Sequence, residues 1–216
     1  MPETPLHDPA IDLIVQVLRA WVLRVGRDAS VLRNVAVRFA RTLPQVGCDP
    51  DVCVYEPAIP VTETSICLWH EGRSAPTIAV EVVSEGSAAE GYVDNPDRYA
   101  ACGAGELWVF DPLLLGPRDH GGPWRLQVWS RRRDGSFVLA YAGDGPAFSE
   151  RLDAWLVVTD EGRRLRVADD EEGRALWPTP EDAERAAKEA ALAEIERLRA
   201  ELARARASPR RARRRP

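Results

Sequence analysis

The sequence predicts one α/β domain built around a mixed β-sheet, followed by a separate charged helix. Hydrophobic residues make up 45% of the 216 positions and charged residues 29%, a balance typical of a folded protein. Segments with helical spacing alternate with short apolar, β-branched segments, as in α/β folds. Residues 179–206 are instead rich in Ala, Glu, Arg and Leu, which favours a helix outside the core.

The first predicted elements are a helix and a strand. From Pro9 to Arg24, apolar residues recur at helical spacing with polar residues between them, which predicts an amphipathic helix packed on a sheet. From Asn34 to Ala40, the larger apolar residues fall on every second position, which is the period of a strand.

Two further strands each carry an acid. In DPDVCVYEPAIP, Pro50 at the entrance and Pro57 at the exit fit a strand of about five residues that begins next to Asp51. The segment TIAVEVV, from Thr77 to Val83, is apolar except for Glu81 and predicts a strand buried on both faces. A carboxylate in such a strand requires a ligand or a partner.

The remaining core elements follow closely. Asp94 to Cys102 predicts a short helix with Pro96 in its first turn. The strand ELWVFDP comes next, and Trp124–Ser130 and Phe137–Tyr141 form a predicted hairpin with RRRDGS as its turn. We expect the core to end near Val158.

This pattern divides the chain into a folded domain at 1–160, a linker at 161–178, a charged helix at 179–206 and a basic disordered tail at 207–216. Thr179 is an expected N-cap. Along the helix, apolar residues recur at alternating spacings of four and three, which favours a coiled coil and a homodimer through this helix. They are Ala191, Ile195, Leu198, Leu202 and Ala205.

Charge and hydropathy restrict the classes of function. No apolar run reaches the roughly 18 residues that span a bilayer, and the first ten residues do not resemble a signal peptide, so we expect a cytoplasmic protein with no membrane partner. The end of the chain, RARASPRRARRRP, contains seven arginines; subtracting these from the net charge of −5 leaves about −12 on an acidic body. The four cysteines lack metal-site spacing and are interpreted as reduced core residues.

Asp51 and Glu81 are the candidate functional residues. Carboxylates on neighbouring strands can converge on one hard divalent cation such as Mg²⁺ or Mn²⁺, which can activate water and stabilise charge on a phosphodiester. The alternative for Asp51 is a turn-capping role. The three histidines, His7, His70 and His120, lie in polar, loop-like contexts and are not expected to be catalytic.

The strings PDVCVY, APTIAVEVVS and DNPDRYAACGAGELWVFDP together resemble the Uma-two-like family of bacterial restriction endonucleases, a branch of the PD-(D/E)xK nuclease superfamily. The resemblance covers roughly residues 10–158. It implies a restriction-endonuclease-like core, a C-terminal helical extension and metal ligation by Asp51 and Glu81. It also matches Tyr99, Trp108 and Asp111, which we interpret as packing and turn residues.

The sequence departs from this family at the catalytic lysine. The superfamily position corresponds to Val83 and the position usual in this branch to Asn95, and neither is a cation. Asn95 can orient water, and Arg98, one turn along, can supply charge but cannot act as a base. The resemblance therefore implies a Mg²⁺-dependent DNA endonuclease, impaired where Asn95 or Arg98 replaces the lysine in part. The alternative is an inactive nuclease fold that serves as a nucleic-acid-binding or oligomerising module.

Overall fold

The computed structural model describes residues 6–60, 62, 64–86, 88, 90–118 and 122–207. The chain divides into two units, Met1–Trp177 and Pro178–Pro216. In chain order, the elements of the first unit are α1 (His7–Val25), β1 (Ser30–Arg33), β2 (Ala36–Arg38), β3 (Gly47–Cys48), β4 (Val52–Tyr55), β5 (Ser65–Cys67), β6 (Ile78–Val82), the π-helical turn η1 (Glu90–Asp94), α2 (Asn95–Cys102), β7 (Glu106–Phe110), β8 (Leu126–Arg131), β9 (Phe137–Gly143), β10 (Ala147–Ser149), β11 (Ala154–Thr159), the 3₁₀ turn η3 (Asp160–Gly162) and β12 (Arg164–Ala168).

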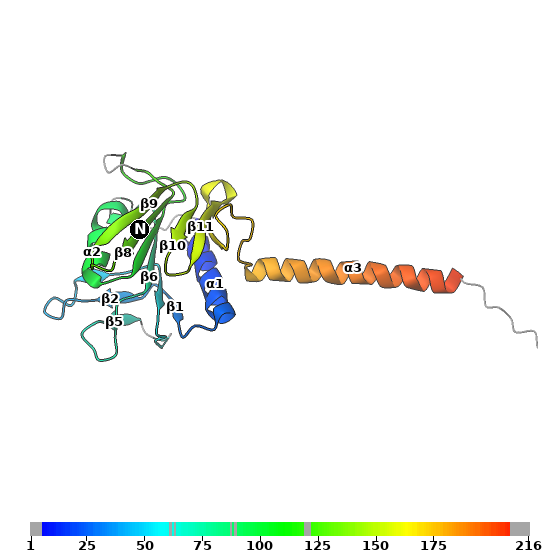
Figure 1. Cartoon of the computed structure of the whole chain (residues 1–216), viewed down its shortest axis with the longest axis horizontal. Coiled ribbons are helices and arrows are strands. Elements are labelled where there is room, and N and C mark those ends of the chain that lie inside the picture. Colours follow the sequence, from blue (N-terminus) through cyan, green and yellow to red (C-terminus); the bar gives the residue numbers. More distant parts are fainter. Residues whose placement is uncertain are drawn as a thin grey trace, which may run out of the picture. The chain divides into compact units, whose positions relative to one another are not determined.

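A six-stranded mixed sheet forms the centre of the first unit (Figure 1). Its strand order is β1-β4-β6-β7-β8-β9. The neighbours β6 and β7 are parallel, and the other pairs in this sheet are antiparallel. Two three-stranded sheets, β10-β11-β12 and β3-β2-β5, accompany it. The predicted α/β fold with a mixed sheet and a C-terminal helix is confirmed.

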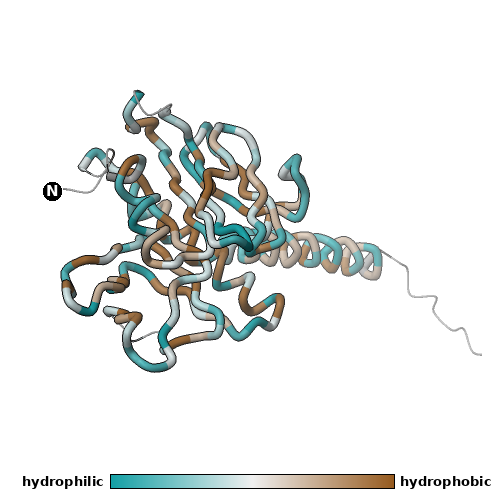
Figure 2. The backbone as a smooth tube through the Cα atoms, turned by 60° about the vertical axis from the view of Figure 1, so that its left-hand side comes forward, coloured by the Kyte–Doolittle hydropathy of each residue, from teal (hydrophilic) through white to brown (hydrophobic). Residues whose placement is uncertain are grey.

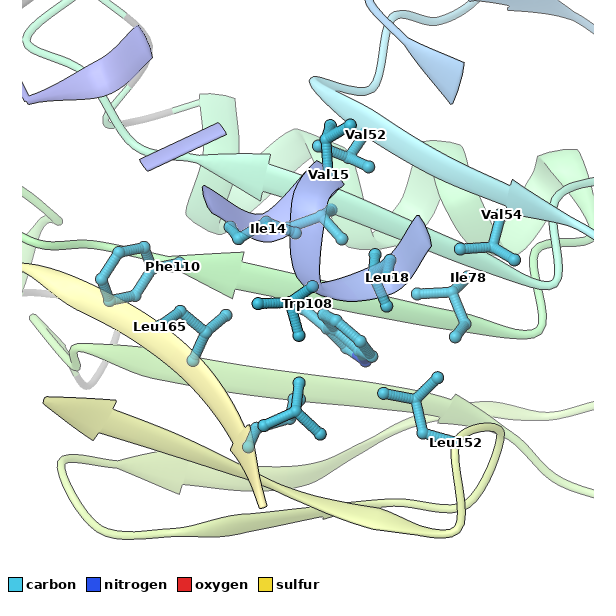
Figure 3. Packing of buried hydrophobic residues seen from close by; sticks show 14 of the residues in the cluster. Ile14, Val15, Leu18, Val52, Val54, Ile78, Trp108, Phe110, Leu152 and Leu165 are labelled. Atoms are coloured by element: carbon cyan, nitrogen blue, oxygen red, sulfur yellow. The ribbon is translucent and has the colours of Figure 1, made fainter. Parts of the chain in front are cut away.

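The two faces of the central sheet bury different sets of residues. On one face, Ile78, Val80 and Val82 of β6 belong to a core cluster with α1 and with the β10-β11-β12 sheet. Figure 3 shows Ile14, Val15 and Leu18 of α1 beside the strand residues of this cluster. On the other face, Ala79 and Val83 pack with Tyr99 and Cys102 of α2. Because side chains alternate along a strand, Glu81 lies on the α2 face.

Most predicted elements are present with small changes at their ends. The helix expected at Pro9–Arg24 begins at His7 and ends at Val25, where Gly26 has the left-handed φ of 63° that terminates many helices. The expected strand at Thr77–Val83 is β6, and the expected helix at Asp94–Cys102 is α2. All four cysteines are free thiols; Cys48, Cys53 and Cys102 are buried as predicted, whereas Cys67 is only partly buried.

The strand predicted at Asn34–Ala40 is shorter than expected and lies elsewhere. Only Ala36–Arg38 forms β2, which pairs with β3 and β5 outside the central sheet. One edge of the central sheet is β1, a strand that the sequence pattern did not predict. Asn34 follows β1 with a positive φ of 51°, so the chain turns between the two strands. One alternating segment could not reveal this division.

The predicted linker at 161–178 is wrong, and the folded unit does not end at 160. Within this range, β12 pairs antiparallel with β11 along its whole length and buries Leu165 and Val167 against the core that contains α1. Trp177 is also buried, and its ring stacks on that of Trp21 with 6.5 Å between centroids. The sequence did not predict β12 because the segment RLRVA is short and flanked by acidic residues. Only Leu165 and Val167 show the alternation expected of a strand.

The second unit contains α3 (Pro180–Ala207). Thr179 Oγ1 accepts a hydrogen bond from the Asp182 N–H at 3.0 Å, and Asp182 Oδ2 accepts one from the Thr179 N–H at 3.1 Å. This reciprocal capping confirms the predicted helix start. Within the described part of the chain, no helix is long and apolar enough to cross a membrane. The arginine-rich tail predicted at 207–216 lies outside the described residues from position 208 onward.

Replacing Leu165 by Ala tests whether β12 belongs to the core. The side chain is 3% exposed, so we expect Leu165→Ala to lower the free energy of unfolding by about 2 to 5 kcal/mol. Urea denaturation of both proteins measures this difference. Arg164→Ala, at the exposed neighbouring position, should change stability by no more than about 0.5 kcal/mol. Equal stabilities of the two variants would show that β12 contributes no buried surface.

Candidate functional site

Asp51 lies immediately before β4 and reaches across to β6. Its Oδ2 accepts a hydrogen bond from the Val82 N–H at 2.7 Å, and its side chain is 16% exposed. Pro50 precedes it at the strand entrance, as the sequence suggested. The carboxylate is therefore held in one place by the backbone of the neighbouring strand and remains partly open to solvent.

Glu81 is half-buried in β6 and is paired with a tyrosine. The Tyr99 hydroxyl of α2 donates a hydrogen bond to Glu81 Oε1 at 2.5 Å. Burial raises the pKa of Tyr99, and the nearby charge of Glu81 raises this pKa further, so the hydroxyl keeps its proton and acts as a donor. Tyr99 therefore orients Glu81, a role beyond the packing role that the sequence suggested.

Strand register brings the two acids together. In the antiparallel β4–β6 pair, Val52 lies opposite Val80 and Cys53 opposite Ala79. Continuing this register by one residue places Asp51 opposite Glu81. Opposed residues of an antiparallel pair point to the same face, with Cβ atoms about 5 Å apart. The predicted juxtaposition of the two carboxylates therefore follows from the sheet.

His7 belongs to this region, although its polar sequence context predicted a loop. It is the first residue of α1 and is 8% exposed, and its Nε2 lies 3.5 Å from Asp51 Oδ2. The missed signal is helical periodicity: His7 precedes Ile11 by four residues and Ile14 by seven, so it shares their inward face. The other predicted non-catalytic histidines differ: His70 is exposed in a turn, and His120 lies outside the described residues.

The two residues expected to replace the lysine occupy different environments. Asn95 is the first residue of α2 and is 8% exposed. It precedes Tyr99 by four positions and therefore lies on the same face of α2, toward Glu81. Arg98 is exposed. Burial thus favours Asn95 over Arg98 as the side chain facing the two carboxylates.

The carboxylate pair has the chemistry of a hard-cation site. The hydrogen bonds described above engage Oδ2 of Asp51 and Oε1 of Glu81, and each carboxylate has a second oxygen. Within the described ranges, no group of three or more His, Cys, Asp and Glu side chains is arranged to hold a metal ion. A cation here would therefore take two protein carboxylates and complete its shell with water or substrate oxygens, as Mg²⁺ commonly does. The residues present fit such an ion.

Another carboxylate, Glu106 of β7, is fully buried and belongs to the core. It accepts hydrogen bonds from Trp108 Nε1 at 2.9 Å, Ser149 Oγ at 2.6 Å and the Arg151 N–H at 3.1 Å. These bonds fasten the turn after β10 to the central sheet. Burial raises the pKa of Glu106, and its hydrogen-bond donors offset only part of that effect. The carboxyl group is satisfied inside the protein and is not available to a ligand.

Asp111 is also fully buried and confirms its predicted turn role. Its oxygens accept hydrogen bonds from the N–H groups of Leu115 at 3.0 Å and Gly116 at 2.8 Å, and from the Tyr92 hydroxyl at 3.1 Å. Trp108 is 1% exposed and packs in the core as expected. Of the residues that match the family motifs, Asp51 and Glu81 form the carboxylate pair. Trp108 and Asp111 support the surrounding fold.

The candidate site therefore consists of two opposed carboxylates and a tyrosine-bearing helix on one face of a mixed sheet. The chain belongs to the Uma2 family, which is described as "Putative restriction endonuclease" and whose model matches residues 1–140. This finding confirms the resemblance drawn from the three sequence strings. No curated protein matches the chain.

Among solved structures, the chain is similar to a crystal structure described as a putative nuclease belonging to DUF820 from Anabaena variabilis ATCC 29413. The two chains are 17% identical, and the similarity covers 70% of this chain and 75% of the other, with a TM-score of 0.45.

The raised pKa of Glu106 predicts a stability that depends on pH. Below its ordinary value of 4.5, Glu106 is protonated in both folded and unfolded chains; as pH rises from there through the higher folded value, the folded chain retains the proton longer. Folding stability should therefore fall across this window for the wild type relative to Glu106→Gln, which does not titrate.

Urea unfolding of both proteins, from pH 4.5 upward, measures the change. Glu161→Gln, whose side chain is 89% exposed, serves as the control and should follow the wild type. Parallel pH profiles for the wild type and Glu106→Gln would contradict the assigned shift.

Proposed function

We propose that this chain is a Mg²⁺-dependent endonuclease that hydrolyses phosphodiester bonds in DNA. The observation that supports this proposal is the opposed pair Asp51 and Glu81, fixed by the Val82 N–H and the Tyr99 hydroxyl in a member of this family. The assignments of Asp51 and Glu81 as metal ligands, and of Asn95 and Arg98 as partial substitutes for the lysine, are parts of the same proposal.

Each residue of the site would have a separate role in hydrolysis. Asp51 and Glu81 hold the cation, which when bound lowers the pKa of water and offsets charge on the phosphate. His7 and Tyr99 position the two carboxylates through the contacts at 3.5 and 2.5 Å. The Asn95 amide orients a water molecule or a phosphate oxygen by hydrogen bonding. Arg98 adds positive charge at the exposed rim and takes no proton, because guanidinium remains charged.

Cleavage of supercoiled plasmid and single-stranded DNA tests this function. Wild-type protein should cut in Mg²⁺ or Mn²⁺ and not in EDTA, and Asp51→Asn with Glu81→Gln should reduce the rate by about 100-fold or more because both ligands are removed. The same ions should raise the melting temperature of the wild type but not of this double variant.

A matched control replaces two exposed acids elsewhere. Asp28→Asn with Glu161→Gln removes the same two negative charges and should retain both cleavage and the metal-dependent rise in melting temperature. If the wild type and the double variant were equally inactive and equally insensitive to metal, the enzyme proposal would fail.

The second candidate function is an inactive nuclease fold that acts as a nucleic-acid-binding or oligomerising module. The observation that favours oligomerisation is the surface of α3. Four large aliphatic side chains on this helix are each about half exposed, and Figure 2 shows hydrophobic and hydrophilic residues alternating along it. They are Leu192 (54%), Ile195 (45%), Leu198 (50%) and Leu202 (51%). Unpaired, this stripe leaves apolar surface in water.

Heptad positions favour a parallel pairing of two such helices. Ile195 and Leu202 occupy a positions and Leu198 a d position. The pair Ile195 at a and Leu198 at d is the combination typical of two-stranded parallel coiled coils. In that arrangement Glu194, at g, lies opposite Arg199 of the second copy, at e. An antiparallel pair would instead oppose like charges. The ion pair of Glu194 with Arg197 on the same helix, at 2.6 Å, is exposed and compatible with both arrangements.

Acidic substitutions on the two faces of α3 test this pairing. Ile195→Glu with Leu198→Glu should convert a dimer to a monomer in size-exclusion light scattering, because it buries charge in the seam. Ala193→Glu with Ala200→Glu adds the same charge at outward f positions and should leave the dimer intact. A monomeric wild type would end the oligomer proposal.

A further inference from the structure

An open hollow of about 520 Å³ lies where the β8–β9 hairpin meets the turn after β10. Its walls consist of Arg131, Arg132, Arg133, Glu150 and Arg151. The hollow is therefore lined by four arginines and one glutamate. A positively charged hollow is unexpected on a domain whose net charge is negative. It lies outside the site formed by Asp51 and Glu81.

Within the described ranges, no ion pair involves Arg132, Arg133 or Arg151, and the charges of Asp134 and Glu106 act on Arg132 and Arg151 only at longer range. Elsewhere, exposed arginines commonly pair with acids, as Arg174 does with Glu172 at 3.1 Å and Arg163 with Asp160 at 3.2 Å. Of the carboxylates in the described ranges, none lies within 4.0 Å of the guanidinium groups of Arg132, Arg133 or Arg151. These three side chains are exposed. They retain the charge needed to bind an anion.

Arg131 forms a rigid wall of the hollow. Its guanidinium donates hydrogen bonds to the carbonyl oxygens of Ala104 at 2.9 Å, Ala100 at 2.7 Å and Gly135 at 2.9 Å, and it lies 5.2 Å from the ring centroid of Phe137. These acceptors are neutral, so Arg131 keeps its net charge. Its position is fixed before any ligand arrives, which lowers the entropic cost of binding.

The backbones that carry the other arginines are also fixed. The Arg132 N–H donates to the Ser136 carbonyl at 2.8 Å, and Asp134 accepts from the Ser136 hydroxyl at 2.6 Å, which closes the hairpin turn. The Arg151 N–H donates to buried Glu106 at 3.1 Å. Side chains on such anchored positions can converge on one ligand.

We propose that this arginine hollow is a phosphate-binding site that takes the backbone phosphates of a nucleic acid. Guanidinium groups match phosphate oxygens with paired hydrogen bonds. The volume falls within the range of ligand sites, and the polar walls favour an anion over an apolar group. Inorganic polyphosphate presents the same chemistry, and the test below distinguishes it.

The position of the hollow favours a nucleic acid. Arg131 donates to the carbonyl oxygens of Tyr99 and Ala100 in α2, and the hydroxyl of the same Tyr99 donates to Glu81. The eight residues of α2 span about 12 Å. Phosphates of one strand are about 3.4 Å apart along a duplex axis, so the two sites are separated by only a few nucleotides. This placement rests on the proposed function, in which DNA reaches Asp51 and Glu81.

Binding of fluorescent duplex and single-stranded DNA to the full-length chain in EDTA tests the hollow without cleavage. Arg132→Gln with Arg133→Gln and Arg151→Gln should raise the dissociation constant about tenfold or more. It should also lower the slope of log K against log salt by about 0.9 for each duplex phosphate that the variant no longer neutralises. Arg131 is left in place because it holds α2. The basic C-terminal segment is the same in every variant.

The charge-matched control is Arg163→Gln with Arg164→Gln and Arg174→Gln, which replaces three exposed arginines that are paired with acids. It should bind DNA like the wild type. Equal binding and equal salt slopes for the two triple variants would overturn the proposal. A melting-temperature rise with tripolyphosphate that is absent only from the hollow variant, combined with unchanged DNA binding, would also overturn the assignment to nucleic acid.

Two results distinguish rejection of the phosphate-site proposal from rejection of the endonuclease proposal. Asp51→Asn with Glu81→Gln should still bind DNA in EDTA, because it leaves the hollow unchanged. If the wild type does not cleave DNA but binding depends on Arg132, Arg133 and Arg151, the hollow stands and the endonuclease proposal falls. If cleavage needs the carboxylates but the hollow variant binds DNA like the wild type, the phosphate-site proposal is rejected and the endonuclease proposal is retained.

Discussion

The antiparallel register of β4 against β6 is the constraint on which the candidate site depends. It opposes Val52 to Val80, which places Asp51 opposite Glu81 on the α2 face. Alternation sends Ile78 and Val80 of β6 into the core beneath α1 at the same time. A slip of one residue would turn those side chains away from the core and Glu81 into it. The energy that fixes the register is therefore apolar burial, and the position of the acids is its consequence.

Helix α2 contacts both the acid pair and Arg131 of β8. Tyr99 is buried against the sheet and donates its hydroxyl hydrogen bond to Glu81, while Arg131 binds the carbonyl oxygen of Ala100 near the end of the helix. The buried Glu106 shows the contrast: three internal donors satisfy it, and it anchors the turn that carries Arg151. The carboxylate of β7 is thus fully buried and internally satisfied, whereas that of the neighbouring β6 is only half-buried.

Local patterns predicted most of the elements, but not how they pair. The helix α1, the strand β6 and the helix α2 follow from periodicity and from their proline and glycine boundaries, because these are properties of neighbouring residues. The division of 30–38 between two sheets and the pairing of β12 with β11 do not follow from them. Such pairings join distant segments, and a three- or four-residue strand has too few side chains to show which sheet buries it.

For the site, the amino-acid pattern made Glu81 a candidate, because a carboxylate inside an apolar strand is costly without a partner. Asp51, whose position also fits a turn cap, became a candidate metal ligand through the family resemblance. The sequence also established that no lysine stands at either expected position. The folded chain was needed to show that His7 lies beside Asp51, that Tyr99 donates to Glu81, and that four arginines surround one hollow. Side chains far apart along the chain meet only after the sheet has formed, since burial and register, not sequence spacing, set their distances.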